Sequence, residues 1–295
     1  MAEYLILKRL KVQRANTIAG LTYGFPSVGS FLGLSHALGR DLEEKGYADR
    51  IVRICILHHR HQLHLYQNRF IQQRQPLLKD GGVRPIVEEG KMELEVSLLC
   101  VLEQHSPFTD QMLLTDDVRT CLMRRRLAGG AIIEVGGCDY CDGEEELRRQ
   151  LYALYPFAAL ADRSDLLREE QHSPDDLAAF MSFCELRRSC IRDDKGQVTW
   201  DFVRRYPGFL VPCHYGYRAL TDIFTADEVH KRALSRPQYG AVFAEPVHSV
   251  AEWVCSVAKF MDYHSRGRMT WEYFQDQDFY LFNHADWEDG DRHGA

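Results

Sequence analysis

The sequence predicts an α+β protein with a ferredoxin-like core, in which an antiparallel sheet carries helices on one face. Three observations support this fold. Segments with strand and helix patterns follow the order β-α-β-β-α-β over residues 1–135, turns that contain glycine separate several of them, and hydrophobic residues make up 45% of the 295-residue chain. A chain of this composition can bury a substantial core.

The first predicted elements are a strand, a turn and a helix. Residues 5–13 carry leucines and a valine among charged residues, as a strand with one charged side does. A turn with two glycines and a proline follows over 20–26. Apolar residues then recur at helical spacing over 28–42, so we expect Ser27 to be the N-cap and Gly46 to end the helix.

Three more strands and a second helix complete the predicted core. The strands cover 51–65, 92–103 and 131–135, and the helix covers 115–127. A polar, glutamine-rich excursion at 67–90 separates the second strand from the third. This order is also that of RNA-recognition-motif (RRM-like) domains, whose open antiparallel sheet is a common platform for RNA.

Two further regions follow the core. We expect residues 136–200 to form an insertion with helical segments, and residues 201–295 to form a strand-rich and helical extension that packs on the core. The predicted elements are helices near 144–154 and 175–188, strands within 198–224 and a helix over 249–264.

Composition excludes several classes of protein. No apolar run approaches the roughly 20 residues that span a bilayer, and the start of the chain has no secretory pattern, so we expect a cytoplasmic protein. The nine cysteines are scattered through apolar segments, which suits reduced thiols better than a disulfide framework. A formal net charge of -7 argues against a uniformly basic nucleic-acid-binding protein.

Basic residues are nevertheless concentrated in one window, residues 50–84. The window has a single acid, Asp80, and seven basic residues: Arg50, Arg53, Arg60, Arg69, Arg74, Lys79 and Arg84. It could bind a polyanion locally while the rest of the surface meets solvent or a basic partner.

Four histidines, His58, His59, His61 and His64, first suggest a catalytic or metal site. On a regular strand His59 and His61 share one face and the other two share the opposite face, so the four cannot converge on one atom. A ligand pair of His59 and His61 stays open, beside the alternative of a polar strand face that stacks and forms hydrogen bonds.

Other motifs for catalysis or metal binding are weak. Cys138 and Cys141 could supply two zinc ligands, but a structural site needs about four, so we favour plain loop cysteines. The sequence has no serine elbow, Walker loop, HExxH or dinucleotide fingerprint. We therefore expect no catalytic residue, no metal and no cofactor.

Two turns that contain glycine are candidate phosphate sites. One, at 24–26, precedes a helix whose free N–H groups could receive a phosphate. The other places Arg126 beside Gly129 and Gly130, where the backbone can be approached closely. The alternative is that these glycines only permit tight turns and that the arginine is solvated.

A series of motifs resembles the Cas-five-type subunit of type I-F CRISPR surveillance (Csy) complexes, and the series runs nearly from end to end. The motifs are LKVQRAN at 10–16, LTYGFP at 21–26, FLGLSHAL at 31–38, VEEG at 87–90, LEVSL at 94–98, RLAGG at 126–130, PGFLVP at 207–212, GYRAL at 216–220 and Glu252-Trp253.

The resemblance implies a scaffold subunit with a ferredoxin-like core and an inserted thumb-like hairpin. It implies that the chain binds the 5′ handle of the guide RNA (crRNA), pairs with the large subunit and contacts the first backbone subunit of the crRNA filament. Target DNA would be reached through the assembled complex. A separate endonuclease makes the cut in such complexes, so the resemblance implies no enzymatic activity for this chain.

From the residues and the resemblance together, we expect RNA contacts at Arg14, Asn16, Tyr23, His59, Arg60, Arg69, Arg74, Arg126 and Tyr217. Arginines would bind phosphates, and the aromatic and polar side chains would stack on splayed bases or bond to them. Two alternatives stay open. One is a metal-independent endoribonuclease that processes precursor RNA with His59 or His61 as its base, and the other is a scaffold without RNA contact.

Overall fold

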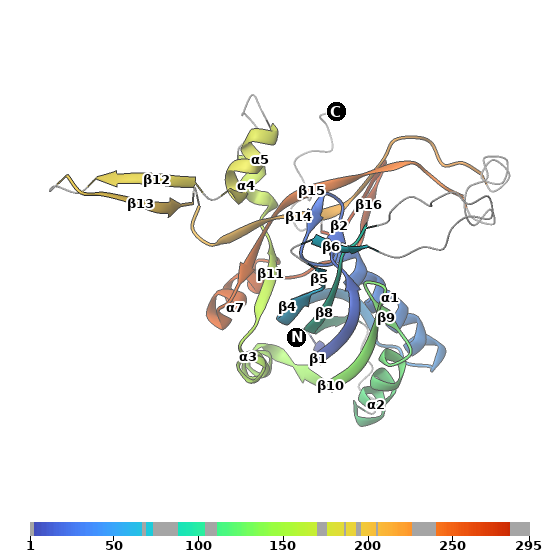
Figure 1. The fold of residues 1–295 in the computed structure, drawn as a ribbon. Coiled ribbons are helices and arrows are strands. Elements are labelled where there is room, and N and C mark those ends of the chain that lie inside the picture. The colour runs from blue at the N-terminus through green and yellow to red at the C-terminus, as the bar shows by residue number, and fades with distance from the viewer. Residues whose placement is uncertain are drawn as a thin grey trace.

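A ten-stranded antiparallel sheet organises the chain (Figure 1). The computed structural model describes residues 3–66, 69–72, 88–103, 111–169, 176–185, 187–192, 196–204, 206–225 and 240–283. Along the sheet the strands are β16 (Phe274–Asp276), β17 (Phe279–Leu281), β14 (Phe209–Ala219), β15 (Ala244–Val254), β11 (Ala158–Asp162), β4 (Arg50–Leu63), β8 (Lys91–Glu103), β1 (Glu3–Asn16), β10 (Gly130–Asp142) and β9 (Arg126–Leu127).

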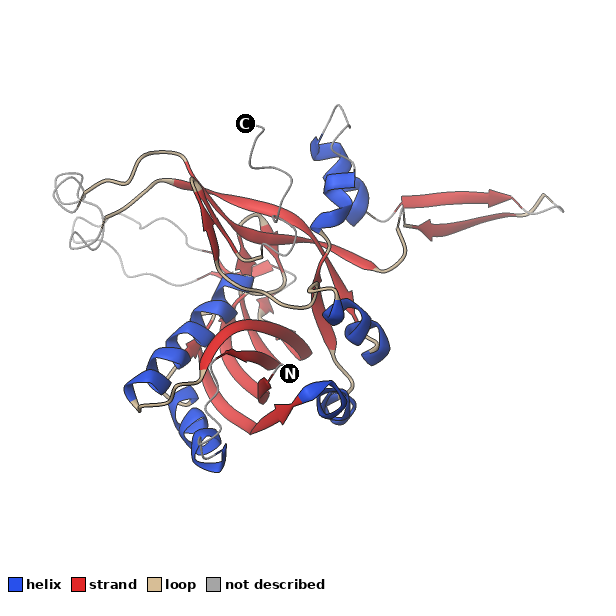
Figure 2. Ribbon diagram, turned by 180° about the vertical axis from the view of Figure 1, so that it is seen from behind, coloured by secondary structure: helices blue, strands red, loops and turns tan. Residues whose placement is uncertain are grey.

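Three smaller sheets stand beside the large one. They pair β2 (Ile18–Ala19) with β3 (Thr22–Tyr23), β12 (Arg187–Arg192) with β13 (Val198–Val203), and β5 (Leu65–Tyr66) with β6 (Arg69–Gln72) and β7 (Glu88–Glu89). The hairpin β12–β13 stands clear of the body, as Figure 2 shows from behind. No helix in the described ranges is long and apolar enough to cross a bilayer.

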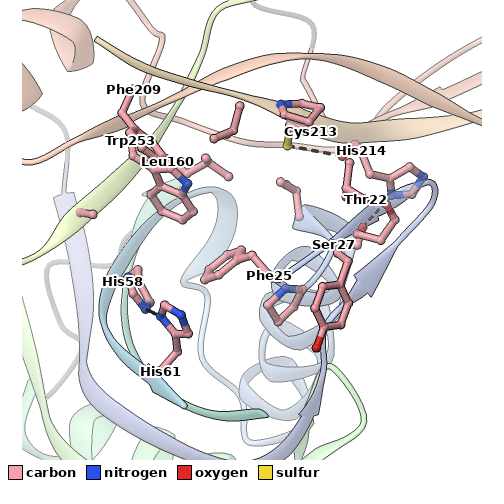
Figure 3. Close-up of a pocket in the computed structure, with 18 of the residues that line it drawn as sticks. Thr22, Phe25, Ser27, His58, His61, Leu160, Phe209, Cys213, His214 and Trp253 are labelled. Carbon is pink, nitrogen blue, oxygen red and sulfur yellow. Dashed lines mark hydrogen bonds between the residues drawn. The ribbon is translucent and has the colours of Figure 1, made fainter. Parts of the chain in front are cut away.

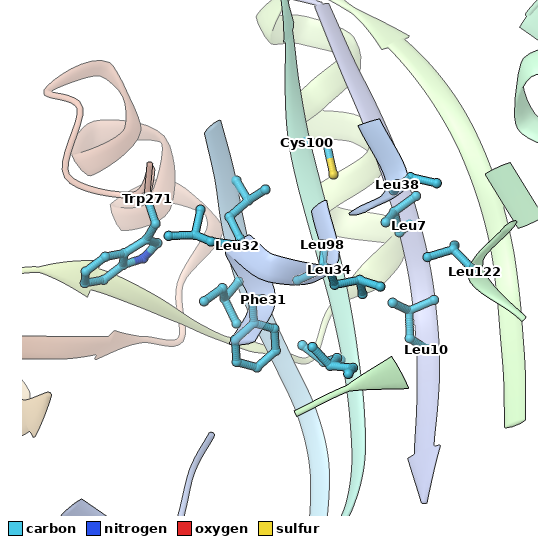
Figure 4. Close-up of a cluster of buried hydrophobic side chains, with 14 of the residues drawn as sticks. Leu7, Leu10, Phe31, Leu32, Leu34, Leu38, Leu98, Cys100, Leu122 and Trp271 are labelled. Carbon is cyan, nitrogen blue, oxygen red and sulfur yellow. The ribbon is translucent and has the colours of Figure 1, made fainter. Parts of the chain in front are cut away.

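One face of the sheet packs against α1 (Val28–Glu44) and α2 (Gln111–Leu122). In α1 the apolar residues recur at helical spacing, so Phe31, Leu34 and Leu38 project onto Leu7 and other buried leucines of the sheet (Figure 4). Each leucine buried in this way contributes about 1.5–3 kcal/mol relative to an exposed one.

The opposite face is covered as well, by α3 (Gly143–Leu154) and α7 (Val257–Ser265). Leu151 of α3 and Phe260 of α7 belong to the cluster that buries Ile6, Leu57 and Leu99. The prediction of helices on one face is therefore wrong for the sheet as a whole. Runs of consecutive apolar residues in β4 and β8 are the sequence sign of burial on both faces, and this part of the sheet is closed to bases.

Several predicted elements are confirmed and others are wrong. The helix α1 begins after Ser27, whose Oγ accepts from the Gly29 N–H at 3.3 Å, and it ends before Gly46, whose φ is +86°. Residues 249–254 belong to β15 and not to a helix, because side chains on both faces of this strand are buried. Likewise α5 (Asp176–Cys184) ends early, since 187–192 pairs with β13.

The cysteine pair lies on a strand and not in a loop. Cys138 pairs with Leu7 across β10 and β1, and Cys141 pairs with Tyr4, so an odd spacing directs the two thiols to opposite faces. Burial raises the pKa of Cys138 to about 12 and that of Cys141 to about 11, which keeps both thiols protonated. In the described ranges no group of three or more His, Cys, Asp or Glu side chains could hold a metal ion.

A buried carboxylate joins the second half of the sheet together. Glu252 of β15 is 1% exposed, and its oxygens accept from Arg163 Nη1 at 2.9 Å, from Lys259 Nζ at 2.5 Å and from Tyr263 Oη at 3.0 Å. Arg163 follows β11, whereas the other two donors lie on α7. A Cβ on Gly208, whose φ is +109°, would lie 2.3 Å from Glu252 Oε1, so the turn before β14 also depends on this carboxylate.

We expect Glu252→Gln to lower the free energy of unfolding by about 3 kcal/mol, because Lys259 loses its anion and the partly buried Arg163 keeps Asp165, 3.1 Å from its Nε, but loses Glu252. Urea denaturation followed by circular dichroism measures the change. Glu245→Gln is the matched control, since Glu245 is half exposed and 3.9 Å from Arg218. Equal stability of the two variants would contradict a structural role for Glu252.

Candidate nucleic-acid interface

The segment from Asn16 to Ser27, which connects β1 to α1, separates two hollows of the surface. Local hydrogen bonds hold it in shape. The Asn16 side chain donates to the Ile18 carbonyl at 2.9 Å and accepts from the Ile18 N–H at 3.2 Å, and the Gly24 N–H donates to the Thr17 carbonyl at 3.0 Å. The Asn16 amide, a predicted RNA contact, thus also stabilises a turn.

The first hollow, which we call the basic groove, has a volume of about 450 Å³. Its lining includes Asn16, Ser30, Lys91, Arg125, Arg126 and Gly129. These residues come from the end of β1, from α1, from β8 and from the β9–β10 turn. The structure thus brings together two predicted RNA contacts, Asn16 and Arg126, that are 110 positions apart in the sequence.

The β9–β10 turn holds Arg126 at the groove through close backbone contact. The Asn16 N–H donates to the Ala128 carbonyl at 2.9 Å. A Cβ on Gly130 would lie 2.7 Å from the Ala15 nitrogen, so only glycine lets the turn press against β1. The exposed Arg126 donates to the Gly129 carbonyl at 3.2 Å and has no acidic partner in the described ranges.

Arg14 lies on the same side, at an irregularity of β1. Its φ is +58°, and the pairing of β1 with β8 shifts between Val12 and Ala15. Such bulges redirect side chains and are common beside functional sites. Gln13 of β1 pairs with Ala131 of β10, and Ala131 pairs with Arg126 of β9. The backbone of Gln13 is therefore two strand spacings, or about 10 Å, from that of Arg126, and Arg14 is the next residue after Gln13.

The arginines of this surface differ in their partners. Arg125 is paired, because its Nε donates to Asp41 Oδ2 at 2.8 Å. The exposed Arg14 has no acidic partner in the ranges that the structure describes. The groove therefore offers an exposed cationic group at Arg126 that an anion could reach, and Arg14 is a second exposed cation on the neighbouring strand.

The second hollow, which we call the aromatic cavity, has a volume of about 760 Å³ (Figure 3). It lies between the segment 19–28, the end of β4, and strands β14 and β15. Phe25, His58 and Trp253 meet there by their edges: the ring centre of Phe25 is 5.6 Å from that of His58 and 4.9 Å from that of Trp253. Tyr23 is part of the lining.

A bulge in β4 rearranges the histidines. The pairing with β8 shifts between His58 and Arg60, so His58 and His61 come to the same face, with 3.1 Å between His58 Nε2 and His61 Nδ1. The prediction that His59 and His61 share a face is therefore wrong. His59 lies on the other face, 2.7 Å from Ser97 Oγ and 3.0 Å from the Pro156 carbonyl.

Burial keeps several of these imidazoles neutral. It lowers the pKa of His58 to about 4, with the neighbouring His61 as the next cause. Burial also lowers the pKa of His59 and of His214, whose Nδ1 is 2.8 Å from Ser27 Oγ. Neutral imidazoles can accept and donate hydrogen bonds to a ligand, but they bring no positive charge to the cavity.

The remaining predicted contacts are dispersed. Arg60 is exposed, and β4 separates it from Arg50 by ten residues, or about 33 Å, so the part of the basic window on β4 is a line and not one patch. Tyr217 of β14 is half exposed and meets the His214 ring edge-on at 4.8 Å. Arg69 belongs to β6, and Arg74 falls outside the residues that the structure describes.

The sequence analysis missed the aromatic residues of the cavity. Phe25 and Trp253 both stand in the motif series, which was the available signal, but nothing in either motif indicates that they meet. His58 was considered only as a member of a histidine cluster. The arrangement as a whole places cations in one hollow and flat rings in the next, which suits a ligand that has both phosphates and bases.

Comparison with known proteins identifies relatives of the chain. The family model described as CRISPR-associated protein (Cas_Csy2) matches residues 5–282. The "CRISPR-associated protein Csy2" of Pseudomonas aeruginosa (strain UCBPP-PA14) is 31% identical over 294 residues, and the alignment covers 85% of this chain and 86% of that protein.

The neutral histidines predict how stability depends on pH. In the unfolded chain His58 titrates near its ordinary pKa of 6.5, whereas in the fold its pKa is about 4. The contribution of the neutral His58 to the free energy of unfolding is therefore complete above pH 6.5 and is lost as the pH falls toward 4. We expect the loss of unfolding free energy between pH 6.5 and 5 to be about 1 kcal/mol smaller in His58→Asn than in the wild type.

Urea denaturation at several pH values within this range measures the difference. Arg266→Gln is the control, because Arg266 is exposed at the C-cap of α7 and lines neither hollow. An identical pH dependence in His58→Asn and the wild type would show that the imidazole does not stay neutral.

Proposed function

The chain belongs to the Csy2 family of CRISPR-associated proteins, and from this premise we propose that it holds the 5′ handle of the guide RNA in a type I-F complex. In this role it is a non-catalytic, cytoplasmic scaffold. It pairs with the large subunit, contacts the first backbone subunit of the crRNA filament and takes part in recognition of target DNA through the assembled complex.

The basic groove is the observation that carries this proposal. In a chain with 43 acidic and 36 basic side chains, Arg126 lies exposed in this groove without an acidic partner in the described ranges. Arg14 is likewise exposed without an acidic partner there, and it follows a residue about 10 Å from Arg126 across the strands. Single-stranded RNA offers a phosphate at every nucleotide, and cations that neutralise phosphates release counterions and so supply much of the affinity. The bulge at Arg14 and the close packing at Gly130 support a binding role, because a solvated arginine needs neither.

The arrangement of the strands supports the scaffold part of the proposal. The central strands follow the order β10–β1–β8–β4, with α1 and α2 on one face, and this order supports the predicted ferredoxin-like core. We assign the thumb-like role to the hairpin β12–β13, which crosses the boundary predicted at residue 200. Trp200 and Phe202 are exposed on it, and the guanidinium of Arg188 lies 5.1 Å from the centre of the Phe202 ring.

The histidine geometry supports a non-catalytic role over the endoribonuclease alternative. Both ring nitrogens of His59 are within hydrogen-bonding distance of protein atoms. His61, the other nominee, shares the aromatic cavity with His58 and not the groove that holds the free arginines. A general base must reach the proton that it removes.

We expect Arg126→Ala and Arg14→Ala each to weaken binding of handle RNA about five-fold in 0.1 M salt. Each variant should also reduce the slope of log K against log salt by about 0.7, because one phosphate contact is lost. Fluorescence anisotropy of a labelled RNA at several salt concentrations measures both quantities. Arg266→Ala, whose side chain is 61% exposed on α7, is the matched control. Unchanged affinity and slope in both test variants would exclude the groove as the RNA site.

We expect precursor CRISPR RNA to remain intact when it is incubated with the pure protein. Denaturing gel electrophoresis after a long incubation at pH 7, with and without a chelator, is the measurement. A discrete product that His59→Ala abolishes would instead favour the endoribonuclease.

A further inference from the structure

We propose that the aromatic cavity holds one unstacked base of the bound RNA against the wall that Phe25, His58 and Trp253 form. This inference rests on the proposed function and assigns a role to the hollow that the arginines do not occupy. The ligand is a nucleobase that has turned out of the RNA strand, recognised by stacking and by hydrogen bonds to its edge.

Flat aromatic rings line the cavity, and packing against other parts of the protein holds them in place. Phe25 stacks on the fully buried Phe31, with 5.5 Å between the ring centres and 13° between the planes. Trp253 is next to Glu252 on β15, and alternation along the strand sends its indole to the cavity while the Glu252 network fixes the opposite face. Stacking on such rings contributes about 1–3 kcal/mol per base.

The size of the cavity suits a nucleotide. Its volume of about 760 Å³ falls within the range of roughly 300–1,000 Å³ found for small-ligand sites. The rings line its inner part, and Phe209, which is 52% exposed and pairs with Trp253 across β14 and β15, lines its mouth. A base could thus pass from one ring surface to the next.

Charge at the mouth favours a nucleotide over an apolar side chain of a protein. None of the described residues that line the cavity is acidic, although acids outnumber bases in the chain. The guanidinium of Arg204 lies 4.7 Å from the ring centre of Phe209 and donates to the Gly208 carbonyl at 3.1 Å. Arg204 has no acidic partner among the described residues. A phosphate of the nucleotide that carries the bound base would be an anionic partner for Arg204.

The inner wall also offers polar groups for the edge of a base. His58 and His61 share one hydrogen bond, which leaves His61 Nε2 without a partner among the described residues. The hydroxyl of Ser27 is a second polar group of the lining. Because burial keeps His58 neutral near pH 7, its imidazole does not repel the donor groups of a base.

The cavity and the basic groove both reach the N-terminus of α1. Ser27 lines the cavity and Ser30 lines the groove, and these residues are about 4.5 Å apart along the helix axis. An RNA strand held at Arg126 therefore needs to cross only one helical turn to place a base beside Phe25.

A double-mutant cycle between protein and RNA tests the proposal. Handle RNAs that carry an abasic ribose at one position at a time are titrated into the full-length protein. We expect one position to lose about 10-fold to 100-fold in affinity with the wild type. That loss should shrink several-fold in Trp253→Leu and in Phe209→Ala, because the base has then lost its stacking partner.

Phe209→Ala keeps the test valid if Trp253→Leu fails to fold, since the Phe209 ring is half exposed. Tyr152→Ala is the matched control, because this ring is 61% exposed on α3, away from both hollows, and the abasic loss should be unchanged. Suppose that intact RNA binds in a salt-dependent way, but at no position does the affinity lost through the abasic ribose depend on these rings. That result would overturn the cavity assignment alone. A protein segment as the true occupant would give this result. Absence of salt-dependent binding in the wild type would overturn the proposed function instead.

Discussion

The second half of the molecule depends on the burial of one carboxylate. The Glu252 carboxylate, which is 1% exposed, is tolerable only if charged and hydroxyl donors replace the water it has lost. Arg163 after β11 and Lys259 and Tyr263 of α7 supply these donors and so link both elements to β15. Trp253 follows Glu252 on β15 and therefore points to the opposite face, toward the aromatic cavity.

The order of elements in the first half could be predicted from the sequence because periodicity there is strong. The leucines of α1 recur at helical spacing, and β4 and β8 alternate or run apolar, so their types were predicted correctly. Prediction failed at 249–254, where a short apolar segment with one buried acid fits a helix as well as a strand. Pairing with β14 and β11 decides between them, and no local pattern shows that pairing.

In the candidate site, too, features with a local sequence pattern could be predicted and features that depend on strand pairing could not. Arg126 and Asn16 could be predicted because glycine turns and motifs mark them locally, although only the pairing of β9, β10 and β1 shows that they meet. The aromatic cavity could not be predicted. Phe25 and Trp253 are more than 200 residues apart, and the bulge after His58 reverses the faces that strict alternation assigns to the histidines.

The edges of the large sheet have a consequence for how such a subunit assembles. The sheet ends on β9, with two residues, and on β16, with three. Because β9 pairs only with Gly130 and Ala131, the rest of the 13-residue β10 forms the edge on that side in the described part of the chain. Open backbone groups along such an edge can pair with a strand of another molecule. Contacts with other subunits can therefore use the backbone of β10 as well as side chains.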